Sequence, residues 1–239
     1  MKRNIFLVHG WGGTKNSLQE LSKLIQQGDT VYLLDLPGFG EAPNPPADWG
    51  PYEYAEYVSK WIAKKSKENS KKDSENIYIG HSFGGGIGVT LADTKPDLID
   101  KLILMSSAIY RNPKVDPTIK KLQKLPFYKS TKNSLKGMKK LIYRTVFKNS
   151  DSHKFEELES NYRKIISTDL SHHLPNINQP TLILWGDEDV DTPVDEARKL
   201  NQMIHNSEVK LYKGFTHGLP KNNPEIIAED VINFINQEK

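Results

Sequence analysis

Short apolar runs alternate along this chain with longer segments whose apolar residues have helical spacing. The runs predict β-strands near residues 4–9, 30–35, 76–81, 101–106, 180–185 and 208–212. The helical patterns lie near residues 16–27, 51–67, 83–93, 194–204 and 224–237. Apolar strands separated by helices are typical of a mainly parallel sheet with helices on both faces. We therefore predict an α/β fold with about six core strands.

The most informative motif is the pentapeptide Gly80-His81-Ser82-Phe83-Gly84, which follows one of these strands and opens a helix rich in small residues. In this context G-x-S-x-G predicts a nucleophile elbow, a sharp strand-to-helix turn that exposes the serine. The turn is strained, and its close backbone approach requires glycines around the serine. Ser82 is therefore the candidate nucleophile.

A serine hydroxyl needs a general base, and the base needs a carboxylate that fixes its tautomer. His217 follows the last predicted strand between two glycines and is the candidate base. The candidate acid is Asp189, in the loop after strand 180–185 and four residues before Pro193. The remaining histidines have other places in the predicted fold. His81 lies inside the G-x-S-x-G motif, His9 in the glycine-rich segment of residues 9–13 and His205 on a predicted helix. The other three, in the middle of the chain, are His153, His172 and His173.

Other carboxylates and a second glycine motif complete the candidate site. Asp187 and Asp191 flank Asp189 and are interpreted as loop or helix-capping groups. The first predicted strand leads into residues 9–13 (HGWGG), where a backbone amide can bind a developing oxyanion. We assign the oxyanion hole to the backbone N–H groups of Trp11 and Phe83. All five site residues follow the carboxyl ends of predicted strands, where open α/β sheets bind their ligands.

With these residues in the order Ser, Asp, His, the chain resembles the α/β-hydrolase family over nearly its whole length apart from the middle. Residues 35–40 (DLPGFG) resemble the family's loop after the second core strand, which is the predicted strand near residues 30–35. Glu41-Ala42 follows this loop, whereas Glu-Ser is frequent there in the family. Because the oxyanion-loop strand comes first, we expect the family's leading hairpin to be absent. The resemblance implies a serine hydrolase of carboxylic esters that forms an acyl-enzyme intermediate.

The resemblance leaves other activities open. An acyl homoserine lactonase, a thioesterase or a C–C bond hydrolase could use the same site, and a non-catalytic ligand-binding protein of this fold is the alternative from another class. Small esters or lactones are the preferred substrates, because no amine- or diacid-specific pocket is visible in the sequence. We expect no cofactor and no metal, since metal-ligand spacings such as H-E-x-x-H do not occur.

The middle of the chain breaks the strand-helix alternation, at the position where the family often carries a helical cap. We predict a core domain of residues 1–108 and 176–239 and a cap insertion of residues 109–175. One cap helix is predicted from an apolar stripe, and four aromatic residues are candidates for the pocket wall. The stripe comprises Leu135, Met138, Leu141, Ile142 and Val146, and the aromatic candidates are Phe127, Tyr128, Tyr143 and Phe147.

Residues 109–150 are basic, with twelve Lys or Arg against one acid, Asp116, in a chain of net charge +3. We interpret them as a solvated lysine face on amphipathic helices, and an acidic partner, an anionic substrate or a membrane surface as the alternative. Few arginines and the lack of a nucleic-acid-reading motif exclude nucleic acid from the expected partners.

Composition is that of a globular protein, with 239 residues, 36% hydrophobic and 26% charged. The chain contains no cysteine, which excludes disulfides and thiolate catalysis. The apolar run after Met1 is too short for a signal peptide, and no run reaches the roughly 20 residues of a membrane span. We expect a cytoplasmic protein without stable membrane insertion.

Overall fold

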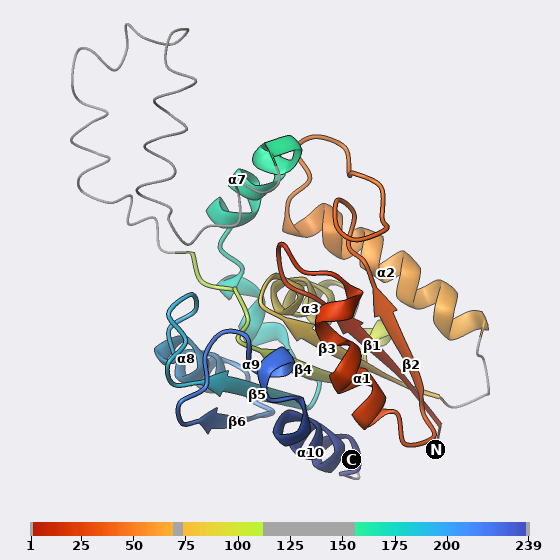
Figure 1. The fold of residues 1–239 in the computed structure, drawn as a ribbon, viewed down its shortest axis with the longest axis vertical. Helices are drawn as coiled ribbons and strands as arrows, with labels where there is room; N and C mark the ends of the chain where they lie inside the picture. The colour runs from red at the N-terminus through yellow and green to blue at the C-terminus, as the bar shows by residue number, and fades with distance from the viewer. Residues whose placement is uncertain (1, 69–73, 112–155, 238–239) are drawn as a thin grey trace, which may run out of the picture.

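The computed structural model describes residues 2–68, 74–111 and 156–237. Six strands in this part of the chain form one parallel sheet in the order β2-β1-β3-β4-β5-β6 (Figure 1). They are β1 (Arg3–Val8), β2 (Thr30–Leu34), β3 (Glu75–His81), β4 (Lys101–Met105), β5 (Thr181–Gly186) and β6 (Ser207–Tyr212). The predicted parallel sheet is confirmed, and each predicted strand lies within two residues of an observed one.

Helices separate the strands as the hydrophobic pattern predicts. The α-helices are α1 (Gln19–Ile25), α2 (Pro51–Glu68), α3 (Phe83–Thr94), α7 (Glu159–Ser167), α8 (Asp195–Met203), α9 (Leu219–Asn222) and α10 (Pro224–Ile235). Short 3-10 turns are η1 (Lys15–Leu18), η2 (Pro96–Leu98), η4 (Glu156–Leu158) and η5 (Ser171–Asn176). Helices α7 and α9 have no counterpart among the predicted helical patterns, although α7 falls within the predicted helical cap, and His205 lies just beyond α8 rather than on a helix.

Alternate residues of each strand enter two separate cores, one on each face of the sheet. Phe6 and Val8 of β1 pack toward α2, α3 and α8, whereas Ile5 and Leu7 pack toward α1 and α10. Each of these four side chains is at most 1% exposed. Fully burying such a side chain contributes about 1.5–3 kcal/mol, so two buried faces explain why the strands are apolar throughout.

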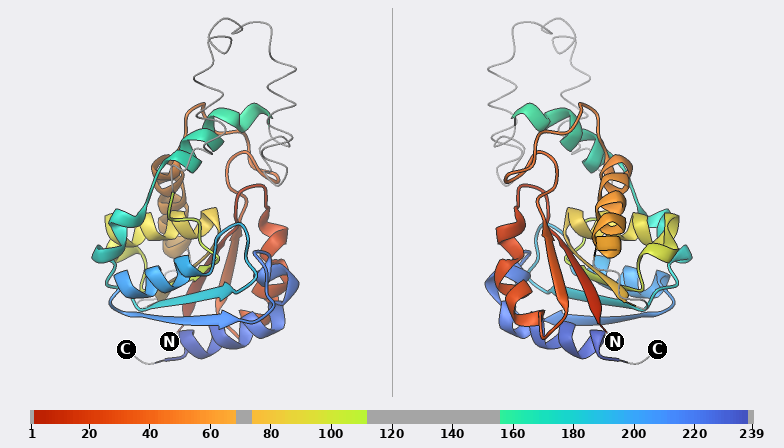
Figure 2. Two further views of the ribbon diagram at one scale, coloured as in Figure 1. Left: turned by 90° about the vertical axis from the view of Figure 1, so that its left-hand side faces the viewer. Right: turned by 90° about the vertical axis from the view of Figure 1, so that its right-hand side faces the viewer.

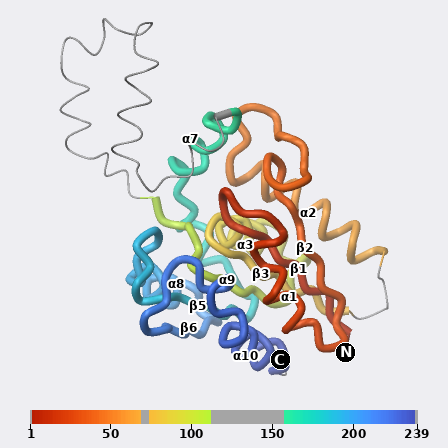
Figure 3. The backbone as a smooth tube through the Cα atoms, in the orientation of Figure 1, coloured from red at the N-terminus to blue at the C-terminus, as the bar shows by residue number. Residues whose placement is uncertain are grey.

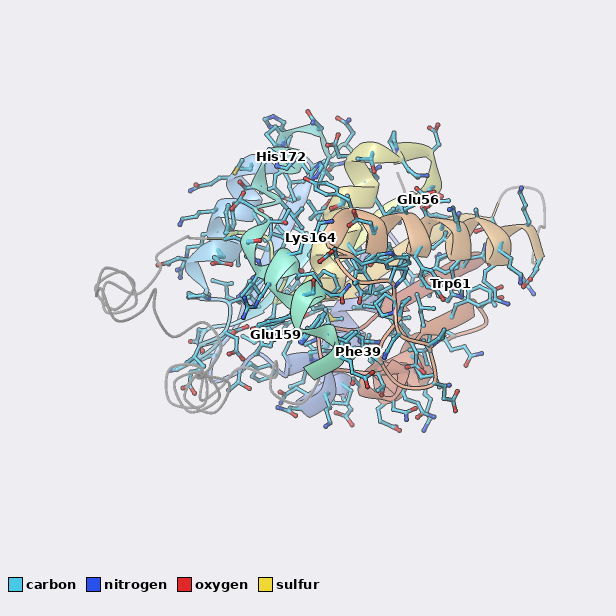
Figure 4. The ribbon with its side chains drawn as sticks, turned by 90° about the horizontal axis from the view of Figure 1, so that it is seen from above. Phe39, Glu56, Trp61, Glu159, Lys164 and His172 are labelled. Atoms are coloured by element: carbon cyan, nitrogen blue, oxygen red, sulfur yellow. The ribbon has the colours of Figure 1, made fainter. Side chains whose placement is uncertain are left out.

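Helix α7 lies beyond the carboxyl ends of the strands, as the side views show (Figure 2). Leu158 and Ile165 attach this part of the chain to the core on the α2–α3 face. Lys164 Nζ donates to Glu53 Oε1 on α2 at 2.9 Å, and the view from above shows α7 beside α2 (Figure 4). The predicted stripe and aromatic residues within 112–155 lie outside the described residues, and the cap boundaries stay predictions.

Both ends of the chain lie on the side of the molecule opposite α7 (Figure 3). The loops that follow the strands therefore gather at the other end, under α7.

No helix in residues 2–68, 74–111 and 156–237 combines the length and the apolar character needed to cross a bilayer.

Candidate active site

Ser82 occupies the strained turn between β3 and α3. Its backbone has φ 52° and ψ −115°, a conformation that costs a non-glycine residue about 1–3 kcal/mol. Hydrogen bonds to the next strand hold the turn, since Ser82 N–H donates to Met105 O at 2.9 Å and Ala108 N–H donates to Ser82 O at 3.0 Å. The serine hydroxyl caps no backbone group of α3 and faces the pocket described below.

Glycines let the elbow approach the first strand. A Cβ at Gly84 would overlap the Val8 carbonyl oxygen, and one at Gly80 would lie 2.5 Å from Gly84 O. Both obstacles are backbone atoms and cannot turn aside as a flexible side chain can. The steric requirement expected from the G-x-S-x-G motif is therefore present.

We expect Gly84→Ala to lower the free energy of unfolding by about 3 kcal/mol or more, because β1 and α3 must separate to admit the methyl group. That corresponds to a Tm fall of about 6–12 °C. The matched control is Gly28→Ala, where φ is +91° and nothing lies within 4 Å of the new Cβ. There only the left-handed backbone cost of about 1–2 kcal/mol applies. Thermal unfolding of both variants measures the difference, and equal Tm shifts would contradict the steric explanation.

Asp189 and His217 are brought together from the loops after β5 and β6. His217 Nδ1 lies 2.9 Å from Asp189 Oδ2 and 3.2 Å from Oδ1. A carboxylate only accepts hydrogen bonds, so Nδ1 carries the proton and Nε2 is left as the basic nitrogen. The arrangement is that of a histidine oriented by an acid, as a general base requires.

The Asp189 carboxylate is completely buried and has several donors. Its side chain is 0% exposed, and Oδ1 accepts the backbone N–H groups of Asp191 at 3.0 Å and Thr192 at 2.9 Å. The Thr192 hydroxyl donates to Oδ2 at 2.9 Å. Burial acts to raise the pKa of Asp189, but the hydrogen bond and charge of His217 and the Thr192 N–H outweigh it and lower the pKa to about 2. Asp189 is therefore ionised at neutral pH.

The two neighbouring acids have different surroundings. Asp187 Oδ1 accepts the Gly214 N–H at 2.7 Å and so holds the loop after β6. Asp191 is exposed and lines the pocket. Asp189, Asp191 and His217 each place a potential ligand atom within 4.8 Å of the others, the one such metal-like cluster in the described part of the chain. Hydrogen bonds to Asp189 from the His217 ring and from the Asp191 backbone N–H account for this closeness.

A cavity of about 350 Å³ joins the candidate residues, since Ser82, His217, Trp11 and Phe83 all line it. Its size lies in the range of small-molecule sites. Among the described contacts, no hydrogen bond joins the Ser82 hydroxyl to the His217 ring. Catalytic hydrogen bonds are often long in unliganded sites and shorten when substrate binds. Four of the five predicted residues thus line one pocket, and the fifth, Asp189, is joined to it by its hydrogen bond to His217. Their catalytic roles stay predictions.

The two predicted oxyanion donors come from the start of α3 and from the loop after β1. Phe83 is the first residue of α3, where backbone N–H groups have no partner within the helix. Trp11 lies in the loop after β1, and its ring packs against Phe39 with a centroid distance of 4.9 Å and against Tyr162 of α7 at 5.2 Å. These contacts fix the loop that carries the Trp11 amide.

Two histidines that sequence analysis left without a role position the site. The His81 ring donates from Nε2 to the His217 backbone oxygen at 2.8 Å. Its pKa is lowered to about 3 by burial and by the nearby His217, so the ring is neutral. His9 Nδ1–H donates to Gly10 O at 2.8 Å, and the Leu36 N–H donates to Nε2 at 3.0 Å. The sequence indicated a role for these two histidines only through their positions, His81 in the G-x-S-x-G motif and His9 in residues 9–13.

The loop of residues 35–40 contacts His9 through the Leu36 N–H and is itself held by several contacts. Asp35 accepts the backbone N–H groups of Lys15 at 2.6 Å and Glu41 at 3.1 Å. Gly40 has φ +57° and leaves no room for a Cβ beside the Asp35 carboxyl group. Glu41 follows this loop and forms an ion pair with Lys15 on the surface.

Comparison with known proteins agrees with this architecture. Residues 3–131, more than half of the chain, match the family model described as alpha/beta hydrolase fold. A 2-hydroxy-6-oxononadienedioate/2-hydroxy-6-oxononatrienedioate hydrolase of Pseudomonas putida is 23% identical over 98% of this chain and 88% of its own length. A pimeloyl-[acyl-carrier protein] methyl ester esterase of Vibrio vulnificus is 23% identical over 97% of this chain and 93% of its own length.

Solved structures are also similar. The crystal structure of a hydrolase from Pseudomonas aeruginosa PA01 superposes with a TM-score of 0.74 and 18% identity, covering 99% of this chain and 91% of that one. A likeness at this level of identity concerns the fold alone.

Proposed function

Because this chain belongs to the alpha/beta hydrolase fold family and has hydrolases among its relatives, we propose that it is a serine hydrolase of carboxylic esters. Ser82 is the proposed nucleophile, His217 the general base and Asp189 the acid that orients it. The backbone N–H groups of Trp11 and Phe83 are the proposed oxyanion donors.

In the proposed mechanism, His217 Nε2 takes the Ser82 proton as Oγ attacks the ester carbonyl. The negative charge that develops on the carbonyl oxygen is stabilised by the Trp11 and Phe83 amides. The imidazolium then returns its proton to the leaving alcohol, and an acyl-enzyme remains on Ser82. Water enters by the same route, with His217 again as base, and releases the acid. Asp189 keeps Nδ1 protonated and stabilises the positive ring throughout.

The observation that carries this proposal is the buried Asp189 carboxylate 2.9 Å from Nδ1 of His217, a histidine that lines the same pocket as the strained Ser82 turn. A structural ion pair would explain the first contact alone. It would not explain why the elbow is maintained against its conformational cost beside the same histidine.

Carbon–carbon bond hydrolysis, which the sequence left open for this site, is the second candidate, because the Pseudomonas putida relative is named as a hydrolase of an oxo-dicarboxylate rather than of an ester. The methyl ester esterase relative favours ester cleavage equally at 23% identity. Both reactions would use Ser82, His217 and Asp189. Lactone and thioester hydrolysis are further alternatives for the same residues.

The experiment is a substrate panel combined with covalent labelling. Purified protein is tested on nitrophenyl esters of increasing chain length, acyl homoserine lactones and acyl thioesters, and is treated with a serine-directed phosphonate. We expect ester turnover and rapid labelling at Ser82, found by mass spectrometry of the modified peptide. A non-catalytic ligand-binding protein would show neither, and labelling that persists in Ser82→Ala would exclude this nucleophile.

A further inference from the structure

Arg111 enters the candidate pocket from the segment that follows β4. It lines the cavity together with Ser82, Tyr162 and Ile165. Its backbone N–H donates to Asp169 Oδ2 at 2.7 Å, which fixes where the side chain starts. A guanidinium group therefore shares the cavity with the proposed nucleophile.

The guanidinium has no partner among the described residues. Arg111 Nε is buried without a hydrogen bond, and no described carboxylate lies within ion-pair distance of the side chain. The other described arginines are all paired: Arg3 with Asp29 at 3.1 Å, Arg163 with Glu159 at 2.5 Å and Arg198 with Asp195 at 2.6 Å. Arg111 is only partly buried, but a guanidinium nitrogen removed from water without a hydrogen bond is unfavourable, so its place in a cavity points to a partner supplied from outside.

The acidic groups whose charges act on Arg111 offset its charge only in part, without an ion pair to the guanidinium. Glu196 lies near Arg111, but burial raises the pKa of Glu196 to about 7 in spite of the opposing charges of Arg111 and Lys199. Asp169 is engaged by the backbone N–H groups of Arg111 and Ser171. Burial lowers the pKa of Arg111, yet arginine stays protonated in proteins.

The walls around Arg111 set the kind of anion that fits. Ile165, Ile166 and Tyr162 make one side of the cavity largely apolar. Lys221 adds a second positive charge to the lining and Asp191 one negative charge, so the lining keeps a net positive charge with Arg111. An apolar chain that ends in a carboxylate matches this combination, because guanidinium and carboxylate groups form paired, charge-assisted hydrogen bonds.

We propose that the natural substrate is an ester whose acyl chain ends in a carboxylate, a half-ester of a dicarboxylic acid, with that carboxylate bound by Arg111 while the ester carbonyl lies at Ser82. This inference rests on the proposed ester hydrolysis and names its substrate class. It differs from the small esters or lactones that the sequence favoured, because the position of Arg111 in the pocket becomes visible only in the structure.

The kinetic test uses a pair of esters of equal shape. Monomethyl adipate carries the carboxylate, and methyl 6-methylheptanoate carries an isopropyl group in its place. We expect the wild-type protein to favour the anionic ester in kcat/KM by about 10- to 100-fold, the range of a charge-assisted hydrogen bond. In Arg111→Met this preference should be lost, and Arg111→Lys should keep part of it, since it retains the charge without the planar fork.

The matched control is Arg198→Met, which removes the same charge from an exposed position outside the pocket. It should leave the preference unchanged. The preference should also persist at about 0.5 M salt, because a partly buried pair is screened less than long-range attraction. If the preference were lost in Arg198→Met or at high salt, general electrostatic attraction would explain it, and the inference of a specific site at Arg111 would be wrong.

A binding measurement separates this inference from the proposed reaction. Ser82→Ala and Ser82→Ala/Arg111→Met are titrated calorimetrically with monomethyl adipate, and we expect at least a tenfold weaker Kd in the double variant. Arg111-dependent binding without any ester turnover would contradict the ester hydrolysis and leave the anion site standing. Turnover with no difference between the paired esters, or equal Kd values, would overturn the Arg111 inference. Circular dichroism and Tm show that the variants are folded.

Discussion

Replacing Ser82 with alanine should lower kcat by about 10⁴–10⁶, because the proposed acyl-enzyme cannot form without the hydroxyl. Tm should change by only a degree or two, since the Ser82 side chain caps no helix group and alanine keeps the same Cβ in the strained turn. His217→Ala should cause a kcat loss of the same size. It should also lower Tm by a few degrees, because the buried Asp189 carboxylate loses one donor but keeps Thr192 and Asp191.

The double variant tests whether the two residues act as one unit. Because loss of either residue removes the whole proton-transfer step, Ser82→Ala/His217→Ala should lose little more than either single variant. Ser59→Ala is the matched control: this serine lies on α2, where it donates to Glu56 O, and should keep full activity. Steady-state kinetics with the best ester of the panel provides the rates. If Ser82→Ala kept more than a tenth of the wild-type rate, Ser82 would not be the nucleophile.

Much of the fold follows from local pattern in this sequence. Because the strands are buried on both faces, their sequences are continuous apolar runs such as residues 102–105. Such runs can be recognised without knowing which strands pair with each other. The elbow is also local, since Gly80, Ser82 and Gly84 must serve one turn. Helix α9 has only four residues and follows the glycine-flanked His217, so it carries no periodic signal.

The parts that could not be predicted depend on contacts between distant segments. His81 acts on the backbone oxygen of His217, 136 residues away, and His9 receives a hydrogen bond from Leu36, 27 residues away. No local pattern encodes either pair. Arg111 belongs to a sequence segment with many basic residues, and only its position in the cavity separates it from the surface lysines of the prediction.

The identity of the acid is a similar case, because three aspartates lie within five residues of the loop after β5. Spacing before Pro193 favours Asp189 without excluding its neighbours. In the structure the surroundings differ: Asp189 is buried against His217, Asp187 holds the Gly214 N–H and Asp191 is exposed in the pocket. Each position therefore makes a different kinetic prediction.

Asp189→Asn should lower kcat by about 10³–10⁴, because an asparagine amide stabilises the imidazolium poorly and favours the wrong His217 tautomer. Since the pKa of Asp189 is lowered to about 2, the carboxylate is ionised across the neutral and alkaline range, and the loss should be similar at every pH there. Asp187→Asn and Asp191→Asn should each cost less than about tenfold. Asp191 lies near both Asp189 and His217, so the double variant Asp189→Asn/Asp191→Asn shows how much of the activity left in Asp189→Asn depends on Asp191. Single-turnover rates of the four variants, each checked for folding, decide the assignment: a larger loss in Asp191→Asn than in Asp189→Asn would move the acid to Asp191.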